Sequence, residues 1–121
     1  MVLKVLAIDD SRTIRDLLAV SLTESGFAIT LAEDGQDGLE KLDHSDPDVV
    51  ITDINMPRLD GFGVIEGVRR NATHSHKPIL VLTTESSPAM KARARDAGAT
   101  GWIVKPFDDE ALAAAIRRVT A

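Results

Sequence analysis

Cysteine and tyrosine are absent from this chain, and aromatic residues make up only 3% of it. Without cysteine the protein forms no disulfides and uses no thiolate chemistry. Long apolar runs are also missing, since none approaches the roughly 20 residues that a membrane helix needs. The N-terminus lacks a secretory signal, because Lys4 interrupts the first apolar run and Asp9-Asp10 end it. We therefore expect a cytoplasmic protein with no membrane partner.

Blocks of like charge do not occur, although the formal net charge is −5. Nucleic-acid binding usually shows as a clustered basic patch, so we expect no nucleic-acid partner. The chain has 121 residues, of which 44% are hydrophobic, and this is enough for one ordinary core. No linker or low-complexity tract divides the sequence, so we expect residues 1–121 to form a single domain.

Apolar runs alternate with segments of helical periodicity along the whole chain. Strands are predicted at residues 2–8, 27–32, 49–52, 79–82 and 101–104. The helices between and after them are predicted to begin at Ser11, Asp34, Asp60, Ser87 and Asp108. Of these residues, Asp34, Asp60 and Ser87 are predicted to be N-caps. Strict alternation of strands and helices predicts an α/β fold, a doubly wound parallel five-stranded sheet with helices on both faces.

The first predicted helix has a clear apolar face. Ile14, Leu17, Leu18 and Leu22 recur at helical intervals, and we expect all four to face the core. Gly26 follows at the position where a left-handed residue commonly ends a helix.

Polar residues follow four of the five predicted strands. They are Asp9 and Asp10 after the first, Asp53 after the third, Thr83 after the fourth and Lys105 after the fifth. Ligands of open parallel α/β sheets bind beyond the carboxyl ends of the strands, so we expect these side chains to share one crevice. Taken singly, each could be a helix cap, a turn residue, a strand residue or a solvated lysine. Their common placement is what indicates a site.

Three carboxylates in one crevice repel one another. Two of them about 4 Å apart cost roughly 1 kcal/mol in water and roughly 4 kcal/mol at an effective dielectric constant near 20. A hard divalent cation relieves this repulsion, and Mg²⁺ binds through one or two carboxylates, waters and often a phosphate. Lys105 adds a positive charge that can hold a phosphate. The acids, the hydroxyl and the lysine together predict Mg²⁺-dependent phosphoryl transfer.

Four motifs carry a resemblance to a known family. They are IDDS (residues 8–11), TDINMPRLDG (52–61), TTE (83–85) and KPF (105–107). In this order and spacing the chain resembles the receiver domain of two-component response regulators, and most of all a stand-alone CheY-type chemotaxis regulator. The stretch ATGWIVKPF (99–107) also resembles that branch. The resemblance implies a flavodoxin-like (βα)5 fold with strand order 2-1-3-4-5, and a receiver domain without an effector domain.

The resemblance also implies which residues carry out the phosphoryl transfer. Asp53 would be the phospho-acceptor, and Thr83 and Lys105 would hold the phosphoryl oxygens. Thr83 and Trp102 would form the conformational switch, with tryptophan at a position where tyrosine or phenylalanine is commoner. Pro106 would follow a cis peptide bond.

The same resemblance implies a magnesium site and two positions that tune the lifetime of the phosphorylated state. Asp9, Asp10, Asp53 and the backbone carbonyl of Asn55 would be the protein ligands of Mg²⁺, with Asp9 acting mainly through water. Asn55 and Glu85 would set how long the phosphoryl group lasts.

The implied partners are a histidine kinase of the chemotaxis type as phosphodonor, a flagellar motor switch protein as target, and a phosphatase. The chain would be a monomer that controls its partner through the last two helices and the fifth strand. It would be no enzyme toward other substrates, since it would catalyse only its own phosphorylation and dephosphorylation. Two alternatives stay open within the family: a phosphate sink that drains a shared kinase, and a single-domain regulator outside motility.

Two readings outside the family are less well supported. An aspartyl-phosphate phosphatase of the haloacid-dehalogenase type also uses a strand-end aspartate and Mg²⁺, but it needs a second aspartate two residues later as general acid. Here that position is Asn55. A nucleotide or flavin module is disfavoured because neither G-x-x-x-x-G-K-[ST] nor G-x-G-x-x-G follows the first strand.

Three histidines raise the question of a second metal site. His74 and His76 lie two residues apart in a polar stretch with no cysteine, and His44 is separate. We interpret His74 and His76 as surface loop histidines.

Overall fold

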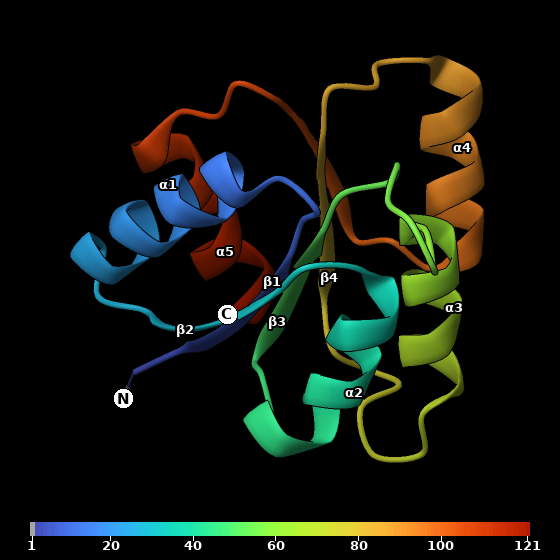
Figure 1. Ribbon diagram of the computed structural model, residues 1–121, viewed down its shortest axis with the longest axis horizontal. Coiled ribbons are helices and arrows are strands. Elements are labelled where there is room, and N and C mark those ends of the chain that lie inside the picture. The colour runs from blue at the N-terminus through green and yellow to red at the C-terminus, as the bar shows by residue number, and fades with distance from the viewer. Residues whose placement is uncertain (1) are drawn as a thin grey trace.

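The computed structural model describes residues 2–121, and over that range five strands alternate with five helices (Figure 1). The strands are β1 (Lys4–Ile8), β2 (Ala28–Ala32), β3 (Val49–Thr52), β4 (Ile79–Thr83) and β5 (Gly101–Val104). The helices are α1 (Arg12–Glu24), α2 (Gly35–Ser45), α3 (Gly61–Arg70), α4 (Pro88–Ala97) and α5 (Asp109–Thr120). Among these residues no helix combines the length and the apolar composition that crossing a bilayer requires.

The sheet is parallel throughout, with strand order β2-β1-β3-β4-β5. Helices α1 and α5 cover one face and α2, α3 and α4 cover the other (Figure 1). The predicted α/β class and the strand order implied by the resemblance are therefore confirmed. The order changes direction between β1 and β3, which is where ligands bind in doubly wound folds.

Each face of the sheet has its own core. Leu6 and Ile8 pack with α2 and α3 on one face, whereas Val5 and Ala7 pack with α1 and α5 on the other. Successive residues of a strand point to opposite faces, so a strand covered on both sides must be apolar at every position. This explains why the predicted strands are continuous apolar runs.

The five predicted helix starts are confirmed, and each helix has a side-chain N-cap, at Ser11 and Asp108 as well as at the three predicted positions. Ser11, Asp34, Asp60, Ser87 and Asp108 each accept a hydrogen bond from the backbone N–H three residues further on. Each bond satisfies one of the N–H groups that the first helical turn leaves unpaired. The caps therefore fix where each helix leaves the carboxyl edge of the sheet.

Helix α1 corrects one expectation from the sequence. Leu18 and Leu22 are buried, but Leu17 is 53% exposed. The stripe of α1 that faces the sheet is narrower than the apolar pattern suggests, because Leu17 lies on its flank and lines a groove beside Phe107. Gly26 ends the helix with φ 91°, as predicted.

Candidate functional site

Asp9 and Asp53 are brought together by the pairing of β1 with β3. Ile8 lies opposite Thr52 in that pairing, and the residues that follow leave the sheet side by side. The Asp53 N–H donates a 3.0 Å hydrogen bond to the Ile8 carbonyl, so the ladder continues to the acid itself. The backbone of Asp9 is held in the same way, by a 3.1 Å bond from its N–H to the Ala32 carbonyl of β2. Both acids therefore have a rigid backbone support.

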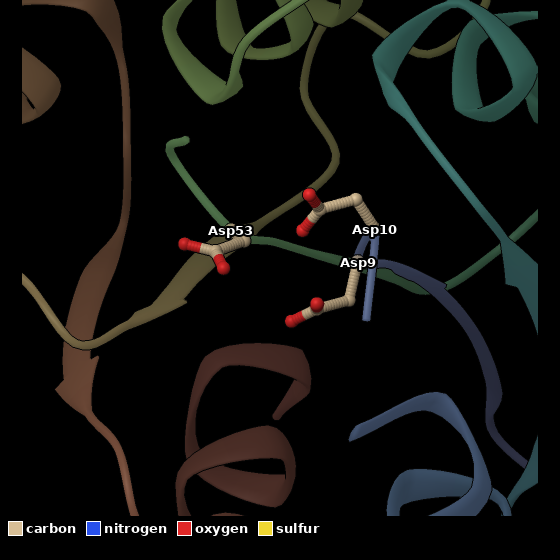
Figure 2. Close-up of side chains that lie close together, drawn as sticks. All are labelled: Asp9, Asp10 and Asp53. Atoms are coloured by element: carbon tan, nitrogen blue, oxygen red, sulfur yellow. The ribbon is translucent and has the colours of Figure 1, made fainter. Parts of the chain in front are cut away.

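The three predicted acids form one cluster (Figure 2). Asp9, Asp10 and Asp53 each place a carboxylate oxygen within 4.8 Å of the others. Asp9 and Asp53 are buried, whereas Asp10 is exposed at the mouth of the cluster. The three acids expected to meet at the strand ends therefore do lie together, the first two at the end of β1 and the third at the end of β3.

Lys105 reaches into this cluster from the end of β5. Its Nζ lies 2.7 Å from Asp9 Oδ2 and 2.8 Å from Asp53 Oδ2. Its backbone N–H donates to the Thr83 carbonyl at 2.8 Å, which fixes the start of its side chain beside the end of β4. The bond between Lys105 and Pro106 is a cis peptide, as the resemblance implies.

Burial and ion pairing act in opposite senses on the charges of this cluster. Burial is the largest effect on Asp9 and raises the pKa of its carboxyl, although hydrogen bonds from Lys105 and the Ser11 N–H offset part of that rise. Burial by itself lowers the pKa of the Lys105 ammonium, but the hydrogen bonds to Asp53 and Asp9 outweigh it and leave this pKa raised. Lys105 therefore keeps its positive charge at neutral pH.

The donors of the cluster fit a hard divalent cation. All the candidate ligand atoms are carboxylate oxygens, which are the side-chain ligands that Mg²⁺ prefers. One lysine offsets only one of the three carboxylate charges, so a negative charge remains in the crevice for a cation to balance. Asn55, whose backbone carbonyl is the fourth expected ligand, lies exposed two residues after Asp53.

Glu85 connects three segments around the site. Its backbone N–H donates to the hydroxyl of Thr83 at 3.3 Å, and Thr83 itself is fully buried at the end of β4. Its carboxylate accepts a 2.9 Å hydrogen bond from the side-chain amide of Asn55. Its carbonyl accepts a 3.0 Å hydrogen bond from the indole of Trp102, which packs half-buried against the core on β5. The expected switch and lifetime residues are thus joined through Glu85.

Several contacts that hold the acids were not predicted. The Ser11 N–H donates to Asp9 Oδ1 at 2.9 Å, and the guanidinium of Arg15 donates to the Asp9 carbonyl at 2.8 Å. The Ile54 N–H donates to Asp53 Oδ1 at 2.6 Å. Two of these donors are backbone groups and carry no sequence signal. Arg15 lies one turn into α1, where an arginine is ordinarily expected to be exposed and to serve solubility alone.

The histidine interpretation was wrong for one residue. His74 is 2% exposed, with its Nε2 3.2 Å from Asp43 Oδ1 of α2, whereas His76 is exposed as expected. Asn71 turns the loop inward, because its side-chain carbonyl accepts hydrogen bonds from the backbone N–H groups of Thr73 and His74. Within residues 2–121 the acidic cluster is the one group of three or more potential metal ligands that lie together, and it includes no histidine.

Comparison with known proteins identifies relatives across nearly the whole chain. Residues 5–117 match the response regulator receiver domain family. Response regulator MprA of Mycobacterium leprae is 41% identical over 115 residues, which cover 95% of this chain and 50% of that protein. The probable transcriptional regulator ycf27 of Guillardia theta is 40% identical over 116 residues, covering 96% of this chain and 44% of that protein. The chain therefore spans about half the length of the curated relatives it matches.

Among solved structures, the chemotaxis protein CheY4 of Vibrio cholerae has a similar fold over its full length. The two structures superpose with a TM-score of 0.93 at 42% sequence identity, and the match covers 98% of this chain and 99% of that one.

Proposed function

Because this chain belongs to the response regulator receiver domain family, we propose that Asp53 is the residue on which it accepts a phosphoryl group. The chain is the receiver domain of a two-component response regulator, and receiver domains take their phosphoryl group from histidine kinases. The observation that best supports Asp53 is the position of Lys105, whose Nζ bridges Asp53 and Asp9 beside Asp10.

The reaction is a displacement at phosphorus by a carboxylate. One oxygen of Asp53 attacks the phosphorus of a phosphohistidine, the new P–O bond forms as the P–N bond breaks, and the released imidazole takes up a proton. The ammonium of Lys105 and the hydroxyl of Thr83 lie at neighbouring strand ends, where they can donate to the oxygens of the transferred group. The sheet holds the backbone of both residues before the reaction begins.

Mg²⁺ supplies positive charge that offsets the charge of the carboxylates and of the transferring group. In this chain Asp9, Asp10, Asp53 and the backbone carbonyl of Asn55 would hold it. Asp9 and Asp53 are fixed by the sheet, and Asp10 is exposed, so the site is open to solvent on one side. A site of this kind leaves room for metal-bound waters and for the phosphate donor.

Phosphorylation would change the loop after β4. The new group raises the negative charge at Asp53 from about −1 to nearly −2 and adds three acceptor oxygens. The hydroxyl of Thr83 would move to donate to one of them and give up its contact with the Glu85 N–H. Trp102 would then turn toward the space that Thr83 leaves, and the surface of α4, β5 and α5 would carry the change to a partner.

The partner we propose is the flagellar motor switch protein, and the phosphodonor is a chemotaxis histidine kinase. The support for this choice is the similarity to CheY4, which extends over the whole of that chemotaxis protein. A phosphate sink or a regulator outside motility remains the second candidate, because relatives of nearly equal identity are named as response regulator MprA and as a transcriptional regulator. The chain would act on no substrate beyond its own phosphoryl group.

The site is tested by phosphorylation of three proteins. Radiolabelled acetyl phosphate, or a phosphorylated histidine kinase, should label the wild type in the presence of Mg²⁺ and should leave Asp53→Asn unlabelled. Asp16→Asn, which changes an exposed acid on α1, should be labelled like the wild type. Undiminished labelling of Asp53→Asn, or of the wild type in excess chelator, would contradict the assignment.

The partner is tested by capture. Wild-type protein with Mg²⁺ and beryllofluoride, which mimics a phosphoryl group on a carboxylate, should retain the purified motor switch protein, and Asp53→Asn should not. Fast transfer from the kinase without any retention would favour the phosphate sink.

A further inference from the structure

We propose that Arg58 is a positioning residue for the magnesium site, acting through its ion pair with Asp34. The pair would hold the loop between β3 and α3, which contains Asn55, in the conformation that binds Mg²⁺. This inference rests on the proposed function, because it concerns the affinity of the same metal site. Neither residue touches the acidic cluster directly, so the effect would be one of pre-organisation.

The pair has the geometry of a strong contact. Arg58 Nε donates to Asp34 Oδ2 at 2.8 Å, and a terminal guanidinium nitrogen donates to Asp34 Oδ1 at 3.0 Å. Two parallel bonds between a planar guanidinium and a carboxylate fix direction as well as distance. The Asp34 side chain is only 8% exposed, although that of Arg58 is 56% exposed. The contact is therefore better ordered than an ordinary surface pair.

Asp34 is itself firmly fixed. It is the N-cap of α2, and its Oδ1 accepts the Asp37 N–H at 2.8 Å. Arg58 thus ties the loop to the start of a helix that is packed on the sheet.

A second contact lies next to the first. The Gly35 N–H donates to the Leu59 carbonyl at 3.2 Å, so the residues that follow Asp34 and Arg58 are also in contact. The approach is so close that a Cβ on Gly35 would collide with the Leu59 backbone. The loop and the start of α2 therefore meet along two consecutive residues, and the pair lies at the edge of that contact.

The backbone of Arg58 suggests that the pair has to hold the loop against strain. Arg58 has φ 65°, in the left-handed region that is unfavourable for residues other than glycine. Glycine would avoid that cost, yet arginine occupies the position. The far end of the loop is closed by the Gly61 N–H, which donates to the Ile54 carbonyl at 2.8 Å. Between these ends, the side chain of Arg58 reaches Asp34, the N-cap of α2.

The ordinary alternative is that the pair merely stabilises the start of α2. An exposed ion pair contributes little to stability, and such a pair would at most change the melting temperature without changing Mg²⁺ binding. Two measurements that do not depend on phosphorylation activity separate these explanations. They are the affinity for Mg²⁺ and the protection of the loop amides from hydrogen exchange.

The test uses two single variants and their combination. Arg58→Gly removes the guanidinium and suits the left-handed backbone, and Asp34→Asn removes the charge but keeps an oxygen for the helix cap. Calorimetry should show that each single variant binds Mg²⁺ about tenfold more weakly than the wild type. The double variant should bind Mg²⁺ as well as the single variant with the lower affinity does. Amide hydrogen exchange at residues 54–60, measured without metal, should accelerate in both. Arg70→Ala, which removes an arginine of an exposed pair on α3, should match the wild type.

The outcomes separate this inference from the metal site itself. Loss of Mg²⁺ binding in Asp10→Asn together with wild-type affinity and exchange in Arg58→Gly and Asp34→Asn would overturn the role of Arg58 and leave the site standing. A wild type that binds no Mg²⁺ would overturn both. Weaker Mg²⁺ binding and faster amide exchange in both single variants, with no further loss of affinity in the double variant, would establish Arg58 as a positioning residue.

Discussion

The indole N–H of Trp102 donates a 3.0 Å hydrogen bond to the backbone carbonyl of Glu85. The N–H of the same Glu85 donates to the hydroxyl of Thr83. A movement of Thr83 toward Asp53 would therefore disturb the loop to which Trp102 is bound. Hydrogen bonds thus connect the end of β4 to Trp102 on β5, along the path that the proposed switch would use.

Trp102 should report this movement directly, because it is the only tryptophan and the chain has no tyrosine. Beryllofluoride with Mg²⁺ should shift its emission to the blue and reduce its quenching by acrylamide, since the indole moves from partial exposure into the space that Thr83 leaves. Thr83→Ala should still be phosphorylated, yet its emission should respond much less. An unchanged spectrum in wild type that is demonstrably phosphorylated would place the moving part elsewhere, with Trp102 a packed aromatic in both states.

Mg²⁺ should stabilise the fold. A ligand that binds only the native state adds about 2.7 kcal/mol to the unfolding free energy at a hundredfold excess over its Kd. Asp10→Asn should lose most of that gain, and without metal it should melt at or above the wild-type temperature because one repulsion is gone. Asp16→Asn on α1 should keep the full gain. Calorimetric melting with and without Mg²⁺ measures all three proteins, and a wild type indifferent to Mg²⁺ would count against the metal site.

Asp34 should contribute to the dependence of stability on acid pH. Hydrogen bonds from Arg58, followed by that from the Asp37 N–H, hold the pKa of Asp34 below its ordinary value. A carboxyl whose pKa is lower in the folded state stabilises the fold above its unfolded pKa, and that contribution is lost as the pH falls through the folded value.

The melting temperature of the wild type should therefore fall more steeply below about pH 4 than that of Asp34→Asn. Arg58→Gly should also show the shallower fall, and adding Asp34→Asn to it should change the slope little. Equal slopes in wild type and Asp34→Asn would show that the pair does not act on this carboxyl.

Arg69 should matter for stability far more than its neighbour Arg70. Its guanidinium donates to the backbone carbonyls of Gly98, Ser75 and Lys77 at 2.6–3.0 Å and so joins the end of α4 to the loop before β4. Arg69→Ala should lower the unfolding free energy by about 1.5–3 kcal/mol. Arg70 lies exposed beside Glu66 at 3.9 Å, and Arg70→Ala should change stability by less than about 0.5 kcal/mol. Urea titrations of the two variants give the comparison, and equal losses would contradict it.

The helix caps show why so much of the fold is predictable from the sequence. A cap such as Ser87 bonds to an N–H three residues away, and Pro88 fits the first helical turn whatever surrounds it. The apolar runs are equally local, because a strand covered on both faces is apolar at each position. The acidic cluster follows from the same local information once the strands are parallel, since parallel strands bring their carboxyl ends to one edge of the sheet.

Contacts between distant parts of the chain were decided only by the tertiary structure. The strand order came from the family resemblance, because alternation alone permits several orders. Leu17 and Leu18 look alike in the sequence, yet only Leu18 faces the sheet. The pairing of Arg58 with Asp34 joins residues 24 positions apart, and no periodicity signals it.

Arg69 and Arg70 show the same limit most clearly, since they are adjacent and chemically identical. Arg69 meets carbonyls from two loops because α3 presents that position to the end of α4, while Arg70 points to solvent. Local propensity and periodicity determine which elements form and which residues end them. Which side chains meet across those elements depends on how the helices pack on the sheet, and that packing is set by contacts summed over the whole chain.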